Sequence, residues 1–207
     1  MTRIAKSDRE EFMATARRHL LNAALVEFAN HGFDLANINT ISQAAGFAKG
    51  TVYNYFTSKE ALMLALIAET GADHVASVRG AVRQVSDPVQ RLLQFYEAGF
   101  TYVAEHPSEA HFLITTLYSP QLQFREAMRR AYLPMFQLVA EEILQPGFSS
   151  GLFRKENPMA LASLLMTIYL GTSSTVDEQG RPYMDAHRVA DFVLRSLSES
   201  PASQEEK

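Results

Sequence analysis

The chain has 207 residues, of which 47% are hydrophobic, and a formal net charge of −4. This length suits one or two small domains, and the hydrophobic fraction is sufficient for a buried core. Because the chain has no cysteine, disulfide bonds, a thiolate nucleophile and cysteine metal sites are excluded. The charged segment 1–12 is not a secretory signal, and no unbroken run of about 18 apolar residues occurs, so we expect no membrane association and a cytoplasmic location.

The charge is unevenly distributed along the chain. Residues 1–60 carry seven Lys or Arg against six acids, which gives +1. Residues 61–207 carry twelve against seventeen, which gives −5. The N-terminal part is therefore the less acidic one, which weakly favours it as the part that would meet a polyanion. So few basic residues imply few phosphate contacts per subunit, and this favours DNA binding as a dimer.

The N-terminal third reads as one long helix followed by two short ones. Apolar residues at helical spacing predict the first helix over 9–31, with Gly32 ending it. Asn37 is the expected N-cap of the next helix, and Gly46 ends that helix in a tight turn. A second short helix is predicted to begin at Ala48. It has an apolar back and a polar front that suits a DNA groove. The back consists of Val52 and Phe56, and the front of Lys49, Thr51, Tyr53, Asn54 and Tyr55.

These residues resemble the helix-turn-helix of the TetR family of transcriptional regulators. The resemblance covers about residues 17–66. Ser42 stands where alanine is common, Ala48 where serine usually caps, and Asn37 where threonine is usual. The matching strings are Ile41-Ser42, Ala45-Gly46, Gly50-Thr51-Val52-Tyr53-Asn54-Tyr55-Phe56 and Lys59-Glu60-Ala61-Leu62.

The chemistry of the polar side chains predicts their roles on DNA. Lys49, Thr51 and Asn54 are predicted to contact base edges or nearby phosphates. Tyrosine hydroxyls are predicted to reach phosphate, and Lys59 is predicted to do so with the positive end of the following helix. Gly50 lets the backbone approach DNA closely. The predicted DNA-binding positions are Asn37, Asn39, Ala48, Lys49, Gly50, Thr51, Tyr53, Asn54, Tyr55 and Lys59.

Three further helices are predicted in the middle of the chain. Ser58 is the expected N-cap of a helix that runs to about 78–83. Asp87 followed by Pro88 is a typical helix start, and this helix is expected to reach about 106. Pro107 then starts a helix over about 107–118.

The last third is predicted to contain three more helices. The first spans about 121–144, with a kink at Pro134, and ends at Pro146-Gly147. Asn157-Pro158 opens a helix to about 172, and the final helix covers about 184–197. No strand-like alternation or repeat occurs, so the predicted fold is all-α with about nine helices.

The predicted division is a helix-turn-helix DNA-binding domain at 1–60 and an effector-binding and dimerisation domain at 61–207. Aromatic and methionine side chains are dense between 95 and 136, and such side chains line adaptable apolar sites. The resemblance implies a small-molecule cavity there. The predicted ligand-binding residues are Tyr96, Phe100, Phe112, Thr116, Met128, Tyr132, Met135, Phe136 and Tyr169.

The last two long helices are predicted to form a two-fold dimer interface. Each carries an apolar stripe, and two such helices from each subunit would form a four-helix interface. The stripes consist of Leu161, Leu164, Leu165 and Ile168 on one helix, and Val189, Phe192, Val193 and Leu197 on the other.

Together these features predict a homodimeric regulator of transcription that acts as a repressor, released from a palindromic DNA operator by a small apolar effector. One alternative is a DNA-bound adaptor without a small-molecule effector. The other is a helical enzyme, which is disfavoured because no acid–base pair, phosphate loop or metal-ligand set is recognisable. We therefore expect no catalytic residues, no cofactor and no metal.

Overall fold

A computed structural model describes residues 6–198, with side chains from residue 9 onward. Within this range the protein consists of helices labelled α1 to α9, with a 3-10 helix, a π-helix and a single isolated bridge between Val176 and Pro182. The all-α prediction is confirmed. Contacts divide the chain into two compact units. The first unit combines the chain up to Gly71 with Pro107–Arg129, and the second combines Ala72–His106 with the chain from Arg130 onward.

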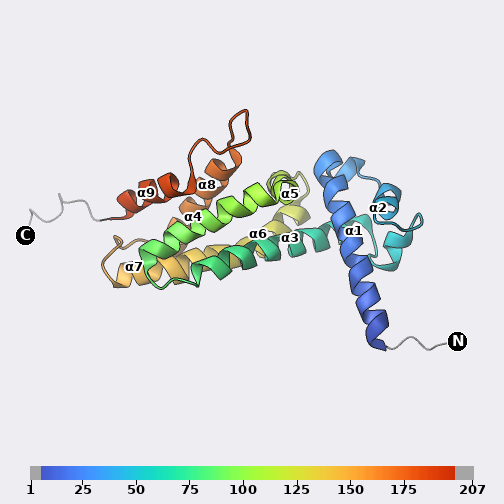
Figure 1. Cartoon of the computed structure of the whole chain (residues 1–207), viewed down its shortest axis with the longest axis horizontal. Coiled ribbons are helices and arrows are strands. Elements are labelled where there is room, and N and C mark those ends of the chain that lie inside the picture. The colour runs from blue at the N-terminus through green and yellow to red at the C-terminus, as the bar shows by residue number, and fades with distance from the viewer. Residues whose placement is uncertain (1–5, 199–207) are drawn as a thin grey trace, which may run out of the picture. The chain divides into compact units, whose positions relative to one another are not determined.

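The first unit is built around α1 (Lys6–Leu35), which packs against α2 (Ile38–Ala44) and α5 (Pro107–Leu117) (Figure 1). The helix begins three residues earlier than the predicted 9–31. Gly32 interrupts it as expected, because its φ of +68° lies in the left-handed region that glycine tolerates. One further turn then follows to Leu35. The 3-10 helix η1 (Thr51–Asn54) packs against α2.

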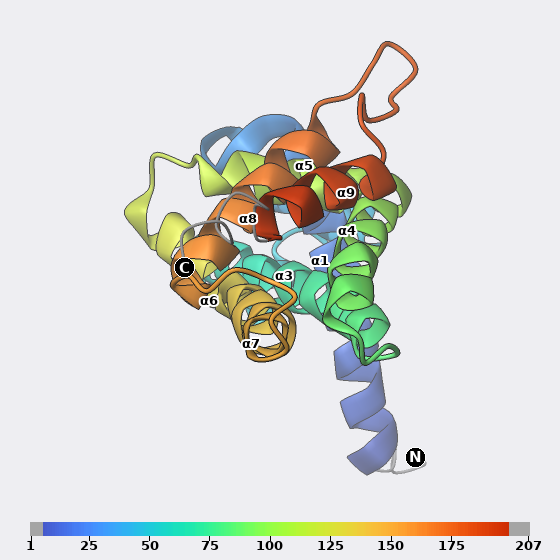
Figure 2. The same ribbon diagram turned by 90° about the vertical axis from the view of Figure 1, so that its left-hand side faces the viewer.

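The second unit is centred on α4 (Pro88–Glu105), which lies against α8 (Pro158–Ser174) and α9 (Ala186–Leu197) (Figures 1 and 2). The predicted helix starts are confirmed by their caps. Asp87 accepts a hydrogen bond from the Gln90 amide, and Asn157 accepts one from the Ala160 amide, both at 2.9 Å. A side-chain oxygen at these positions satisfies an amide that has no partner within the helix.

The helix predicted over 121–144 is longer and less regular than expected. It consists of α6 (Leu122–Gln137), a π-helical stretch over Leu138–Leu144 (η2) and α7 (Gln145–Ser149). Pro134 lies inside α6, and the change to π-helical hydrogen bonding begins one turn later. A proline removes one helical donor, and a π turn is one way in which a helix absorbs such a disturbance.

The prediction that Pro146-Gly147 ends this helix was wrong. Pro146 lies at the start of α7, directly after η2, and the Glu142 carbonyl one turn before it accepts a hydrogen bond from Arg91 at 2.8 Å in place of the missing amide. Gly147 is needed for packing, because a Cβ there would lie 1.9 Å from the Phe153 ring. The helical run therefore continues to Ser149, and Gly151 follows with φ of +72°.

The helix α3 (Lys59–Val82) starts where predicted, since the Ser58 hydroxyl accepts a hydrogen bond from the Ala61 amide at 3.0 Å. Among the described residues, α3 is also long and apolar enough on average to cross a membrane, although no unbroken apolar run of 18 residues occurs in it. Half of its most apolar 18-residue stretch is buried inside the protein. The buried core helix of a globular protein can be equally long and apolar. The buried polar residues Thr70 and His74 of α3 fit such a helix, in which buried polar groups find partners inside the protein.

Candidate functional site

The helix-turn-helix begins with a capped α2. The Asn37 side chain accepts a hydrogen bond from the Asn39 amide at 2.9 Å, as predicted for an N-cap. Ile38 and Ile41 face the interior, and α2 ends before Gly46, whose φ is +83°. The left-handed residue turns the chain toward the segment that the sequence assigns to the DNA groove.

The second short helix differs from the prediction. A helix was expected from Ala48, whereas the structure has a turn at Lys49-Gly50 and a 3-10 helix over Thr51–Asn54. The reason is Gly50, whose φ of +76° cannot continue a right-handed helix. Gly50 instead precedes η1 as its N-terminal boundary residue.

The predicted inner and outer faces of this segment are nevertheless present. Val52 is fully buried and Phe56 is 6% exposed, so the back of the segment packs inward. Tyr53 is 55% exposed, and Lys49 and Asn54 are also exposed. Of the remaining predicted positions, three are exposed and four are half-buried. The exposed ones are Asn37, Asn39 and Ala48, and the half-buried ones are Gly50, Thr51, Tyr55 and Lys59.

Lys59 has internal partners that the sequence did not predict. Its Nζ donates a hydrogen bond to the Asp34 carbonyl at 3.1 Å and lies 5.0 Å from the centre of the Phe33 ring. The Asp34 carboxylate also accepts from Gln121 Nε2 at 3.3 Å. The ammonium group thus attaches the start of α3 to the segment after the Gly32 interruption, in the same region where a phosphate contact is predicted.

Two buried polar residues to which the sequence assigned no role hold the helix-turn-helix together. Glu27, 8% exposed, accepts a hydrogen bond from the Asn37 amide at 2.8 Å. Ser42, fully buried, accepts one from the Val52 amide at 3.4 Å. Nothing in the sequence marked Glu27, whereas Ser42 was visible as a departure from the family pattern.

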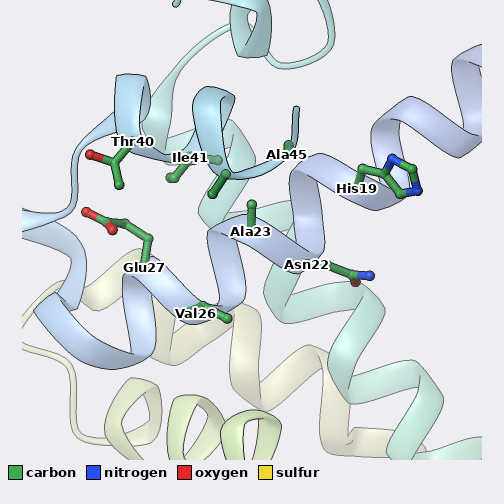
Figure 3. A pocket seen from close by; sticks show the side chains of 9 residues that line it. His19, Asn22, Ala23, Val26, Glu27, Thr40, Ile41 and Ala45 are labelled. Carbon is green, nitrogen blue, oxygen red and sulfur yellow. The ribbon is translucent and has the colours of Figure 1, made fainter. Parts of the chain in front are cut away.

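A pocket of about 490 Å³ lies between α1 and α2 (Figure 3). Its floor is apolar, with Ala23, Ile41 and Ala45. Figure 3 shows Glu27 beside Thr40 at one end and His19 at the other. None of the predicted DNA-binding residues lines this pocket, so it lies apart from the segment that would read DNA.

The predicted ligand-binding residues do not form one set. Phe112, Thr116 and Met128 belong to the first unit, and the other six belong to the second. Phe112 and Thr116 line a pocket of about 310 Å³ in the first unit, together with Phe28, Phe33 and other residues of α1, α3 and α5. All nine side chains are buried or half-buried, in agreement with an internal position.

In the second unit, two of the predicted ligand-binding residues, Tyr132 and Tyr169, lie within hydrogen-bond distance of a histidine to which the sequence assigned no role. His74 is 3% exposed and lies on α3. Its Nδ1 is 2.7 Å from the Tyr132 hydroxyl, and its Nε2 is 2.9 Å from the Tyr169 hydroxyl. Its ring stacks on Tyr102, with centroids 4.1 Å apart. We call these four residues the His74 cluster.

The hydrogen bonds of the His74 cluster run in one direction. The Tyr169 hydroxyl donates to the Gly99 carbonyl at 3.1 Å. A neutral His74 then donates through Nε2 to Tyr169 and accepts at Nδ1 from Tyr132. In this series of hydrogen bonds, from Tyr132 through His74 and Tyr169 to Gly99, each polar atom has a partner. The series joins α3, α4, α6 and α8.

Burial keeps these groups neutral. Burial, reinforced by the nearby His106, lowers the pKa of His74 to about 4. Burial also raises the pKa of the Tyr132, Tyr169 and Tyr96 hydroxyls. Charge formation is disfavoured at each of these sites because a low-polarity interior solvates ions poorly.

Another pocket of the second unit, about 580 Å³, lies between α4 and the start of α9. Phe100 and Tyr102 line it, together with Glu97 and His187, whose side chains approach to 2.6 Å. Phe100 is the only predicted ligand-binding residue among those lining this pocket.

The stripes predicted for a dimer interface are mostly internal. Leu165, Val189, Val193 and Leu197 are each no more than 1% exposed, because they pack within the second unit. Phe192 and Leu164 are the outward-facing members, at 65% and 55% exposed, whereas Leu161 and Ile168 are half-buried. The predicted stripes therefore combined core residues with surface residues. Among the described residues, no group of three or more His, Asp or Glu side chains is arranged to hold a metal ion.

The chain is similar to known proteins both in sequence and in fold. Residues 20–66 match the model of a family described as bacterial regulatory proteins, tetR family. The chain is 37% identical over 98 residues to the transcriptional activator FasR of Mycolicibacterium smegmatis, a match that covers 47% of this chain and 44% of FasR. It thus spans less than half the length of that relative.

A longer match is found with the HTH-type transcriptional regulator YfiR of Bacillus subtilis. The two chains are 30% identical over 150 residues, covering 68% of this chain and 69% of YfiR. Among solved structures, FadR from Bacillus subtilis in complex with stearoyl-CoA superposes with a TM-score of 0.73. That structure is 19% identical and covers 88% of this chain and 97% of FadR, which establishes the shared fold.

Proposed function

Because the chain belongs to the tetR family of bacterial regulatory proteins, we propose that it is a DNA-binding regulator of transcription. We propose further that it acts as a homodimeric repressor on a palindromic operator in the cytoplasm, and that it has no enzymatic activity. The part up to residue 60 would bind DNA, and the part from residue 61 would bind the effector and dimerise.

The observation that carries this proposal is the shape of the helix-turn-helix. Gly50 turns the chain so that η1 buries Val52 and leaves Lys49, Tyr53 and Asn54 exposed. A short element with a buried back and a front of ammonium, hydroxyl and amide groups offers the donors and acceptors that read base edges and phosphates. Two such elements related by a dimer axis would meet successive major grooves about 34–36 Å apart.

The test is selection of duplexes from a randomised DNA library by the full-length protein, followed by titration of the selected duplex. We expect a palindromic sequence, with binding that weakens as salt is raised.

Asn54→Ala is expected to relax the base preference at one position of each half-site by about 1–3 kcal/mol, since it removes a bidentate amide. Gln84→Ala, an exposed amide of the second unit, is the matched control. Failure to select any sequence would refute the proposal.

We propose a small effector with an apolar part, and acyl-CoA thioesters, which join an apolar acyl chain to the anionic coenzyme A, are the first class to test. The second unit has an interior rich in aromatic and methionine side chains, and the structure of Bacillus subtilis FadR contains stearoyl-CoA. The helix α3 begins at Lys59, directly after the helix-turn-helix, and ends at Val82, so a shift of its far end would alter the position of η1. A ligand acts only through its different affinities for the two states, typically about 1–3 kcal/mol.

Stearoyl-CoA, isovaleryl-CoA and free coenzyme A can be titrated by calorimetry into the free protein and into its complex with the selected duplex. Because linkage is reciprocal, an effector must bind the complex more weakly by the same factor by which it weakens DNA binding. Equal binding to both forms would exclude that compound as an effector. If no compound of a broader hydrophobic library binds, the adaptor without an effector becomes the better description.

A further inference from the structure

The start of η1 has no cap from its own segment. Gly50 has no side chain, and Ala48 has no polar side-chain atom. The Thr51 and Tyr53 amides donate to the carbonyls of Ala48 and Gly50, at 3.1 and 3.0 Å. Between them lies the Val52 amide, on a residue that is fully buried and therefore shielded from water.

The Ser42 hydroxyl from α2 accepts the hydrogen bond of the Val52 amide, at 3.4 Å. The backbone carbonyl of Ser42 accepts a second hydrogen bond, from the Phe47 amide at 2.8 Å. Ser42 therefore holds two points of the chain beyond the Gly46 turn, one before Gly50 and one after it. A helical serine can return its hydroxyl hydrogen to a carbonyl of its own helix, which leaves the oxygen available as an acceptor.

We propose that Ser42 is a positioning residue for DNA recognition, because its buried hydroxyl caps η1 from α2 in place of a cap within the segment. The bond fixes the orientation of η1 relative to α2, and with it the exposed Tyr53 and Asn54 that follow. Removing the hydroxyl leaves a buried amide without an acceptor, which favours a rotated or frayed η1. The effect on DNA rests on the proposed function, whereas the cap itself does not.

The experiment compares Ser42→Ala and Ser42→Thr with wild type in the full-length protein. Amide hydrogen exchange, followed by NMR, reports on the Val52 bond directly. Affinity for the duplex selected by wild type, and for a scrambled duplex, reports on recognition. Asp87→Ala is the matched control, because it removes a helix cap in the second unit, whereas η1 belongs to the first.

We expect Ser42→Ala to accelerate exchange of the Val52 amide about tenfold relative to the α1 amides. Affinity for the selected duplex is expected to fall about tenfold relative to Asp87→Ala, with a smaller change for the scrambled duplex, since loosely held base contacts lose specificity first. Ser42→Thr, which keeps the hydroxyl, is expected to restore both.

Unchanged Val52 exchange in Ser42→Ala would overturn the cap. If the Val52 amide of Ser42→Ala exchanges faster but the variant binds the selected duplex as tightly as Asp87→Ala does, the positioning role would be overturned. If wild type selects no duplex, the proposed function fails, and the exchange result still decides the cap.

Discussion

Lys49 and Lys59 flank η1, and their surroundings give them different expected roles. Lys49 is exposed, whereas Lys59 donates to the Asp34 carbonyl and lies over the Phe33 ring. We predict that Lys49→Ala weakens all DNA sequences alike and reduces the salt dependence of log K by about 0.9 per subunit, without changing the free energy of unfolding. Titrations at several salt concentrations measure this.

Lys59→Ala is predicted to lower the free energy of unfolding by about 1 kcal/mol as well as to weaken DNA binding, because it removes a hydrogen bond and a cation–π contact. Lys59→Met, which keeps the aliphatic stem, serves as the control for packing. Urea unfolding and DNA titration of the same samples separate the two effects. A Lys59→Ala protein as stable as wild type would show that the internal contacts contribute nothing.

His74 makes stability depend on pH in a defined direction. Its pKa is about 4 in the folded protein and 6.5 when unfolded, because burial and the nearby His106 disfavour its charged form. Below pH 6.5 the unfolded chain therefore takes up a proton that the folded protein does not. Stability is predicted to fall by about 3 kcal/mol as the pH is lowered from 7 to 4, with only a small further loss below pH 4.

Glu142 also contributes at the acid end of this range, because its pKa is lowered from the usual 4.5, mainly by its hydrogen bond with Arg83. The measurement is therefore the difference between wild type and His74→Gln in urea unfolding at a series of pH values. The variant is expected to be less stable at pH 7 and to lack the part of the stability loss between pH 6.5 and 4 that protonation of His74 causes. Parallel curves for the two proteins would mean that His74 does not carry the pH dependence.

At the scale of elements, α4 and α8 approach closely at Gly99. A Cβ built there would lie 2.5 Å from Cε2 of Tyr169, and the Gly99 carbonyl accepts from the Tyr169 hydroxyl. Gly99→Ala is predicted to destabilise the second unit by about 1–3 kcal/mol, because it displaces a buried ring and the His74 cluster with it.

Gly80 provides the control, since it is an exposed residue of α3 where an added Cβ would have no atom within 4 Å. Gly80→Ala is expected to stabilise the protein by about 0.5–1 kcal/mol through helix propensity alone. Thermal unfolding of both variants checks the pair of predictions. If Gly99→Ala were stabilised to the same extent as Gly80→Ala, α4 and α8 would not be in close contact at Gly99.

At the scale of the whole molecule, the exposed apolar residues of α8 and α9 are the expected dimer contact. Phe192 is 65% exposed and Leu164 is 55% exposed, although the apolar residues that follow them, Val193 and Leu165, are buried. We predict that Phe192→Arg produces monomers in sedimentation, because a charge would be placed in an apolar interface without a partner.

Tyr118→Arg changes a more exposed aromatic residue of the first unit, 79% exposed, and should leave the dimer intact. The monomeric variant is expected to bind the selected duplex much more weakly, since a dimer engages both half-sites. A dimer that persists in Phe192→Arg would place the interface elsewhere.

The sequence by itself determined the helical class, most helix starts and the position of the helix-turn-helix. These features depend on local chemistry: asparagine and aspartate caps, prolines in first turns, and glycines with positive φ at 32 and 46. The buried back of the segment that contains η1, formed by Val52 and Phe56, was also predicted, because it follows from spacing alone.

Only the tertiary structure decided which residues meet across the chain. Glu27, Ser42 and His74 bond to residues 10, 10 and 58 positions away, and no local pattern encodes such partners. For the same reason, the predicted ligand-binding residues divided between two units and the predicted dimer stripes contained core residues. Helical spacing identifies an apolar face, but what covers that face depends on the packing of distant helices.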